Sequence, residues 1–172
     1  MKYDVIIQNE IIAIVHMDES MIFDVWQNSL DEDNRRFVPD EVFETEEDAR
    51  EVVEAIIDFY KSEEGPFIYS IIRQSDESNI GYVQLVKIEE GWEIGYHIAT
   101  KYTGQGYATT AVKLFLEYLK NNTSLKEIYG VALYANEASR RVLEKSGFET
   151  FFVGVGPYQG KRRKIVKTIK RL

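Results

Sequence analysis

The sequence predicts a protein of the α/β class, and more closely an α+β arrangement, in which helices flank a mixed, mostly antiparallel central sheet. Its 172 residues, 44% of them hydrophobic, are enough for one domain with one apolar core. Alternating apolar residues from Phe67 to Ala99 predict three neighbouring strands. Apolar residues at helical spacing before and after this segment predict the flanking helices. Because no stretch is rich enough in Gly, Ser or Pro to serve as a linker, residues 1–172 are expected to form a single domain.

The N-terminal part is predicted to begin with an extended segment over residues 3–15, broken by a turn at Asn9 and Glu10. A helix should follow, because apolar residues recur there at helical spacing and Asp18 or Ser20 can cap it. Its apolar face comprises Met21, Ile22, Val25, Trp26 and Leu30.

The polar segment 29–44 is predicted to be a loop. Thr45, followed by three acidic residues, fits the start of a second helix, since an acidic first turn complements the helix dipole. Gly65 and Pro66 should end the segment. The face of this helix carries Ala49, Val53, Ile56, Ile57 and Tyr60.

From Phe67 onward the spacing of apolar residues changes from that of helices to the alternation typical of strands. Residues 67–73, 80–88 and 92–99 are predicted to form an antiparallel meander with short turns between them. The remaining elements are expected to be a helix over 105–120, a strand over 127–133, a helix over 136–146 closed by Gly147, and a hairpin of 148–155 with 161–172 turning at 156–160.

Charge and composition exclude several functions. The formal net charge of -8 argues against the basic footprint that non-specific nucleic-acid binding needs, so nucleic acid is not expected as a partner. The absence of cysteine excludes disulfides, thiolate metal sites and a catalytic thiol, and no metal site is expected. Polar residues interrupt the apolar N-terminus at Asp4 and Gln8, so neither a signal peptide nor a membrane span is expected there. A cytoplasmic protein without a membrane partner is predicted.

Two glycines, Gly104 and Gly106, stand between a predicted strand and the start of a helix. This arrangement suits phosphate binding, because the unpaired first-turn N–H groups and the positive end of the helix dipole face an anion there. A tight turn that only starts a buried helix is the plainer interpretation. A Rossmann site would require parallel strands, and no Walker A sequence is present.

Two blocks of the sequence resemble the GNAT superfamily of acetyl-coenzyme A-dependent N-acetyltransferases. Residues 92–111 (WEIGYHIATKYTGQGYATTA) resemble its coenzyme-binding motif, although Lys101 departs from the usual Arg or Gln. Residues 136–149 (NEASRRVLEKSGFE) are similar to the branch that contains ribosomal-protein N-terminal and spermidine acetyltransferases. The order of elements also agrees over nearly the whole chain, which implies a single GNAT-type domain with acetyl-CoA as co-substrate and no metal.

The resemblance implies a coenzyme site built largely from backbone groups. The residues it assigns to the pantetheine arm are Ile98, Ala99 and Thr100, and those it assigns to the pyrophosphate are Gly104, Gln105, Gly106, Tyr107, Ala108 and Thr109. Asn136 is expected to hydrogen-bond the coenzyme arm, to act as an N-cap, or to do both. Lys101 either adds a positive charge near the phosphates or is merely solvated.

Acetylation of an amine requires a group that takes a proton from the ammonium and a group that supports the departing thiolate. The resemblance puts a widely used acidic residue at Glu93, which is the expected base, with a solvated Glu as the alternative. Strand alternation puts Glu93, Gly95 and His97 on one face. By resemblance Ser139 is the candidate donor to the coenzyme sulfur. Many GNAT enzymes use a Tyr where this chain has Leu143. For His97, a packed or surface role is preferred to catalysis.

The acceptor is predicted only as a class. The acidic segment 31–51 would suit a cationic amine, such as a polyamine or a basic polypeptide N-terminus, if it lines the acceptor groove. The basic run at 160–164 would instead neutralise nearby carboxylates or the phosphates of the coenzyme. The predicted function is transfer of an acetyl group from acetyl-CoA to a primary amine, borne by a small molecule or a peptide. A catalytically weak or regulatory acyl-CoA-binding module is the alternative, a nucleotide-binding module of another fold is more distant, and a homodimer is left open.

Overall fold

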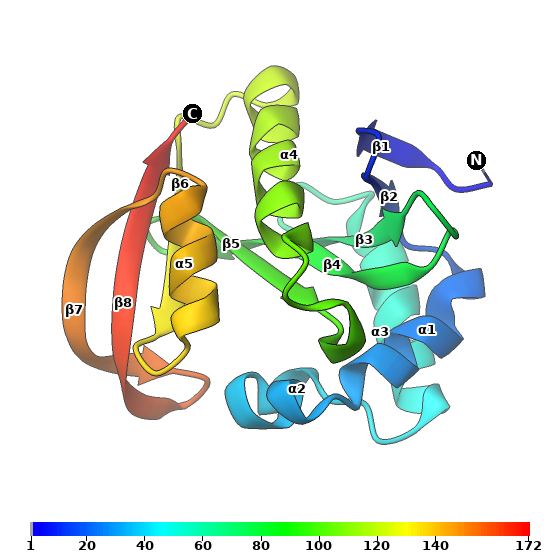
Figure 1. Ribbon diagram of the computed structural model, residues 1–172, viewed down its shortest axis with the longest axis horizontal. Coiled ribbons are helices and arrows are strands. Elements are labelled where there is room, and N and C mark those ends of the chain that lie inside the picture. The colour runs from blue at the N-terminus through cyan, green and yellow to red at the C-terminus, as the bar shows by residue number, and fades with distance from the viewer. Residues whose placement is uncertain (1) are drawn as a thin grey trace.

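Eight strands form one sheet in the order β1-β2-β3-β4-β5-β6-β8-β7 in the computed structural model, which describes residues 2–172 (Figure 1). The only parallel neighbours among these strands are β5 and β6, so the sheet is mixed and mostly antiparallel, as predicted. The strands are β1 Val5–Gln8, β2 Ile12–His16, β3 Phe67–Arg73, β4 Asn79–Ile88, β5 Gly91–Ile98, β6 Glu127–Leu133, β7 Glu149–Tyr158 and β8 Lys161–Arg171.

Helices cover both faces of the sheet because the buried strands carry apolar side chains on both sides. In β2, Ala13 and Val15 pack with the first and third helices, whereas Ile12 and Ile14 pack with the fourth. The helices are α1 Ile22–Ser29, α2 Glu32–Phe37, α3 Glu46–Phe59, α4 Tyr107–Asn122 and α5 Glu137–Lys145. In Figure 1, α4 and α5 stand side by side, and α1, α2 and α3 lie away from them.

Several predicted helix ends are confirmed by their hydrogen bonds. Thr45 Oγ1 accepts the Asp48 N–H while the Asp48 carboxylate accepts the Thr45 N–H, which is a complete capping box. The Asp18 carboxylate accepts the Ser20 N–H at the 3-10 turn before α1. Gly147 follows α5 with a left-handed φ of +83°, the conformation expected of a C-terminal glycine.

The prediction of a loop over 29–44 is wrong, because this segment contains α2 and a 3-10 turn at Pro39–Glu41. Its anchor is polar: Asn34 is 1% exposed, and its side-chain amide donates to the Ser29 carbonyl oxygen at 3.2 Å. Because a buried Asn anchors this helix, its sequence lacks the apolar residues at helical spacing from which helices were predicted. The final hairpin also turns more tightly than predicted, since β7 continues to Tyr158 and the turn is Gln159–Gly160.

The sheet opens between β5 and β6. Within residues 2–172 these two strands pair only at Glu93 with Tyr129 and at Ile94 with Gly130. Beyond Ile94, β5 remains paired with β4 on its other side as far as Ile98. One edge of the C-terminal half of β5 is therefore open, and this opening positions the site.

Candidate active site

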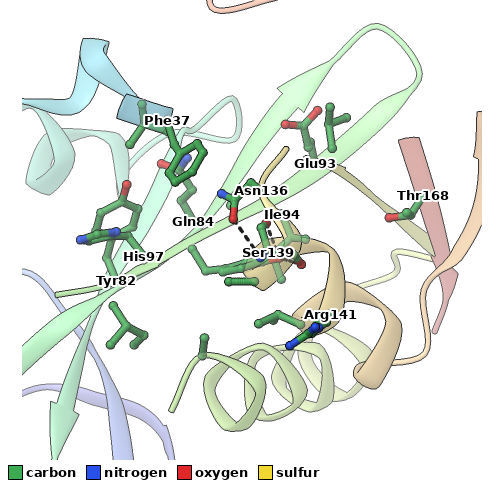
Figure 2. Close-up of a pocket in the computed structure, with 18 of the residues that line it drawn as sticks. Phe37, Tyr82, Gln84, Glu93, Ile94, His97, Asn136, Ser139, Arg141 and Thr168 are labelled. Carbon is green, nitrogen blue, oxygen red and sulfur yellow. Dashed lines mark hydrogen bonds between the residues drawn. The ribbon is translucent and has the colours of Figure 1, made fainter. Parts of the chain in front are cut away.

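A cleft of about 1080 Å³ passes through the opening in the sheet. Phe37 and Glu41 line it on the side of α2, and Asn136 and Ser139 line it on the side of α5. Between them lies β5, which contributes every residue from Glu93 to Ile98. Figure 2 shows Phe37, Tyr82, Gln84 and His97 gathered in one part of this cleft and Ser139 on the helix in another. Groups on opposite faces of the sheet thus meet in one space.

The backbone of β5 offers hydrogen-bonding groups to this cleft. The Ala99 N–H donates to the Ile80 carbonyl oxygen at 2.8 Å, and because peptide groups alternate along a strand, those of Ile98 point to the opposite, open edge. The Thr100 N–H already donates to the Asp31 carboxylate at 2.6 Å. Of the three residues predicted to bind the pantetheine arm, Ile98 lines the cleft, whereas Ala99 and Thr100 do not.

The glycine turn forms the start of α4. Gly104 and Gly106 have φ angles of +75° and +82°, which L side chains rarely adopt, and a Cβ at either position would meet nothing within 4 Å. The first-turn N–H groups of α4 consequently face open space. The cleft is lined here by Gly104, Gly106, Tyr107, Ala108 and Thr109.

Gln105 and Lys101, also singled out in the sequence, are exposed and lie outside the lining of the cleft. The Lys101 ammonium lies 4.9 Å from the centre of the Tyr102 ring. The cations that line the cleft are instead Arg141 and Lys145 on α5 and Lys167 on β8.

The first turn of α5 brings two hydroxyl groups together. The Asn136 side-chain oxygen accepts the Ser139 N–H at 3.1 Å, so Asn136 is an N-cap (Figure 2). The Tyr96 hydroxyl donates to the Ser139 carbonyl oxygen at 2.9 Å and lies 3.0 Å from Ser139 Oγ. Burial raises the pKa of Tyr96 above its usual range, and the phenol therefore stays protonated. Leu143, one turn later, is buried in the core.

Glu93 is half-buried on β5 and is one of the two residues of this strand that pair with β6, just before the opening. Burial raises the pKa of Glu93 to about 7, and the positive charge of Lys167 acts in the opposite direction. Such a carboxylate can both hold and release a proton near neutral pH. Strand register places Glu93, Gly95 and His97 on one face, and Gln84 of β4 fills the space that a Gly95 side chain would need. Tyr96, in contrast, lies on the face of α5.

A second carboxylate, Glu41, lies on the side of α2 and belongs to the acidic segment 31–51 that the sequence analysis placed near the acceptor. The Tyr82 hydroxyl donates a hydrogen bond to it. Burial raises the pKa of Glu41 to about 7, against the lowering effect of a hydrogen bond from Gln84. The sequence carried no signal for this pair, because Glu41 and Tyr82 are 41 residues apart. The Tyr96–Ser139 pair was missed for the same reason.

His97 is largely buried, and burial lowers its pKa against the opposing effect of Asp31. Its Nε2 lies 3.7 Å from the Asp31 carboxylate, too far for a hydrogen bond. His97 is therefore a neutral imidazole packed beside the cleft.

The acidic segment 31–51 faces the cleft only in part. Asp33 and Glu41 line it, whereas Glu44 is exposed and pairs with Arg35 at 2.6 Å, and Asp31 is held by the Thr100 N–H. The basic run at 161–164 is exposed on β8, and none of its residues lines the cleft. The groove is therefore less acidic than the composition of the segment indicates.

Comparisons with known proteins identify the domain. A family model described as "Acetyltransferase (GNAT) domain" matches residues 13–149. The probable N-acetyltransferase YjcK of Bacillus subtilis (strain 168) is 36% identical over 84 residues, which span 46% of this chain and 46% of that protein. The chain thus matches about half the length of this curated relative.

Two solved structures have the same fold over their whole length. A GNAT-family acetyltransferase from Bacillus anthracis is 24% identical with a TM-score of 0.79, covering 96% of this chain and 97% of that one. The ribosomal-protein alpha-N-acetyltransferase RimL, solved in complex with coenzyme A, is 18% identical with a TM-score of 0.82, covering 98% of each chain. At these identities the likeness establishes the fold.

None of the helices within residues 2–172 is long and apolar enough to cross a membrane.

Proposed function

This chain belongs to the GNAT acetyltransferase family, and we propose that it is an N-acetyltransferase that moves an acetyl group from acetyl-CoA to a primary amine in one ternary complex. The observation that carries the proposal is the open edge of β5. It leads from a carboxylate with a raised pKa, Glu93, toward the bare N-terminus of α4 at Gly104 and Gly106. A thioester and an amine can therefore meet between these two ends.

The residues that line the cleft fit acetyl-CoA, which supplies the reactive acetyl thioester. The first-turn N–H groups of α4 would bind its pyrophosphate, because the left-handed glycines leave that space free. The open peptide groups of Ile98 would pair with its pantetheine arm as an added strand. Arg141 and Lys145 on the same side of the sheet add positive charge toward the phosphates.

Glu93 would take a proton from the acceptor ammonium, directly or through water. Burial raises its pKa to about 7 against the opposing charge of Lys167, so it is ionised in part at neutral pH and can accept that proton. On the other face, Ser139 Oγ would donate a hydrogen bond toward the departing sulfur. Tyr96 orients Ser139 through its two contacts with that residue.

The acceptor class is a primary amine of a polypeptide N-terminus, a polyamine or another small molecule. The side of the cleft near α2 carries Asp33, Glu41 and Glu93, whereas Arg141 and Lys145 belong to α5. Lys167 of β8 also lines the cleft and lowers the pKa of Glu93, so three carboxyl groups share that side with one cation. This separation of charge favours an anionic coenzyme on one face and a cationic amine on the other.

The test is release of the coenzyme thiol from acetyl-CoA in the presence of spermidine, peptides with free N-termini and simple alkylamines. A thiol reagent reports this directly, because the chain contains no cysteine. At least one amine should support turnover, and the acetylated amine should be identified by mass spectrometry. Tight coenzyme binding without acetylation of any amine would instead support the acyl-CoA-binding module.

A further inference from the structure

A second cavity, here called the inner pocket, has a volume of about 210 Å³ and lies beside the cleft, on the side of α1 and α3. Five residues line both spaces, so the inner pocket adjoins the cleft: Asn34, Glu41, Tyr82, Gln84 and His97. Its deeper wall is apolar and comprises Met17, Val25, Phe43, Val52, Ile56 and Ile68. Figure 2 shows three of the shared residues, Tyr82, Gln84 and His97, on the part of the cleft near Phe37.

Most polar side chains around the inner pocket have partners within the chain. The Asn28 amide donates to the Asn79 carbonyl oxygen, and Ser29 Oγ donates to the Trp26 carbonyl oxygen. Of the buried side-chain atoms that have no hydrogen-bond partner within residues 2–172, two belong to residues that line the inner pocket, namely Asn34 Oδ1 and His97 Nε2. Asn34 is itself 1% exposed. Unpaired buried polar atoms destabilise a fold, so their presence at a cavity points to a ligand that pairs with them.

We propose that the inner pocket is the acceptor subsite, which takes an apolar group of the size of a ring or a branched aliphatic chain, carried by the reacting primary amine and bearing a hydrogen-bond donor. This assignment rests on the proposed function. The donor of the occupant pairs with Asn34 Oδ1, and the amine lies in the cleft toward Glu93.

Size and chemistry both select this occupant. An apolar cavity of about 150 Å³ holds benzene, so the inner pocket at about 210 Å³ has room for a substituted ring. Asp40 and Glu41 are the acidic residues of the lining, and the Glu41 carboxylate already accepts the Tyr82 hydroxyl. A second ammonium group placed against the apolar wall would therefore be buried without a partner, which is costly. A polyamine is therefore a poorer occupant than an amine with an apolar body.

The strand geometry limits the link between the amine and the apolar group. Gln84, at the mouth of the pocket, faces Gly95, which is two residues from Glu93, or roughly 7 Å along the strand. Both lie on the same face of the sheet. A chain of a few bonds therefore joins the two sites, as in an arylalkylamine.

The first experiment measures kcat/KM for acetylation of ethylamine, 3-methylbutylamine, phenethylamine, tyramine and spermidine. Each methylene group buried in the pocket should raise kcat/KM about fourfold. Tyramine should exceed phenethylamine, because its hydroxyl supplies the donor. Equal values across the series, or a preference for spermidine, would overturn the assignment.

A filling variant tests the location. Val52→Phe, on the apolar wall, should lower the ratio of kcat/KM for phenethylamine over ethylamine by about tenfold, since it occupies the space of the ring. Ala55→Phe, on the exposed face of the same helix, is the matched control and should keep the ratio of the parent protein. Equal ratios in Val52→Phe and the parent protein would place the apolar group elsewhere.

Methyl NMR tests binding in the inner pocket independently of acetyl transfer. Phenethylamine added without acetyl-CoA should shift the methyl signals of Val25, Val52, Ile56 and Ile68 in a saturable manner. If no amine is acetylated but these signals shift, the proposed function fails and the pocket assignment stands. If amines are acetylated while the four residues stay unchanged at saturating phenethylamine, the assignment is wrong.

Discussion

Glu93 combines a reactive position with a pKa of about 7 that burial produces. We expect Glu93→Gln to lower kcat by the order of 10²-fold or more, because Gln cannot take a proton from the ammonium. In the parent protein kcat should rise with pH through about 7 as the carboxylate ionises, and the variant should lack this step. Stopped-flow or steady-state rates from pH 5 to 9 measure both effects.

Glu41 provides the control for this titration, since burial gives it a pKa of about 7 as well. Glu41→Gln should retain the rise of kcat near pH 7, because Glu41 is hydrogen-bonded to Tyr82 on the side of α2. A step that disappears in Glu41→Gln and persists in Glu93→Gln would transfer the role of base to Glu41.

The carboxyl group of Glu93 also affects the stability of the fold. Because the pKa of Glu93 is higher in the folded state than the ordinary value of 4.5, folding binds this proton more tightly. The resulting contribution to stability is fully present below pH 4.5 and is lost as pH rises through about 7. Glu93→Gln should therefore stabilise the protein relative to its parent by on the order of 2 kcal/mol at pH 8.5, and much less at pH 4.5. Urea unfolding at both pH values measures this, and a pH-independent difference would contradict it.

At the level of elements, the turn into α4 combines backbone conformation with anion binding. Gly106→Val should weaken coenzyme A binding at least about tenfold, because the added side chain occupies the space in front of the first-turn N–H groups. Calorimetry measures the change in Kd.

Gly160→Val is the matched control for this prediction. Gly160 in the β7–β8 turn also has a left-handed φ, +73°, and open space around its Cβ position, so the substitution brings a similar backbone strain. It should leave the Kd for coenzyme A near that of the parent protein. Equal loss of affinity in both variants would mean that strain, not the position at α4, causes the effect.

On the scale of the whole molecule, two halves of the sheet are joined at only two paired positions between β5 and β6 within residues 2–172. A coenzyme arm added to the open edge would bridge these halves. Coenzyme A should then slow amide hydrogen exchange at Ile98, whose peptide groups face the opening. It should leave Ala99 little changed, because that amide is already bonded to Ile80. Similar protection of both amides would indicate general stabilisation and not an added strand.

The family and much of the fold could be predicted because their signals are local. The resemblance in residues 92–111 and 136–149 is confirmed by the family match over 13–149. The capping box at Thr45 and the left-handed Gly147 are confirmed as well, since caps depend on residues within one turn of each other. Alternation along β5 correctly separated the face of Glu93 from that of Tyr96.

The sequence by itself determined the strands, the start of α3, the end of α5, the glycine turn before α4 and the family, because each is specified by neighbouring residues or by a continuous motif. Only the tertiary structure decided which groups meet in the cleft. It brought Tyr96 to Ser139 across 43 residues and Tyr82 to Glu41 across 41, and it anchored the polar helix α2 to the end of α1 through the buried Asn34. It also set the pKa of Glu93 and formed the inner pocket. Burial and cavities arise from packing between distant segments, and no local pattern records them.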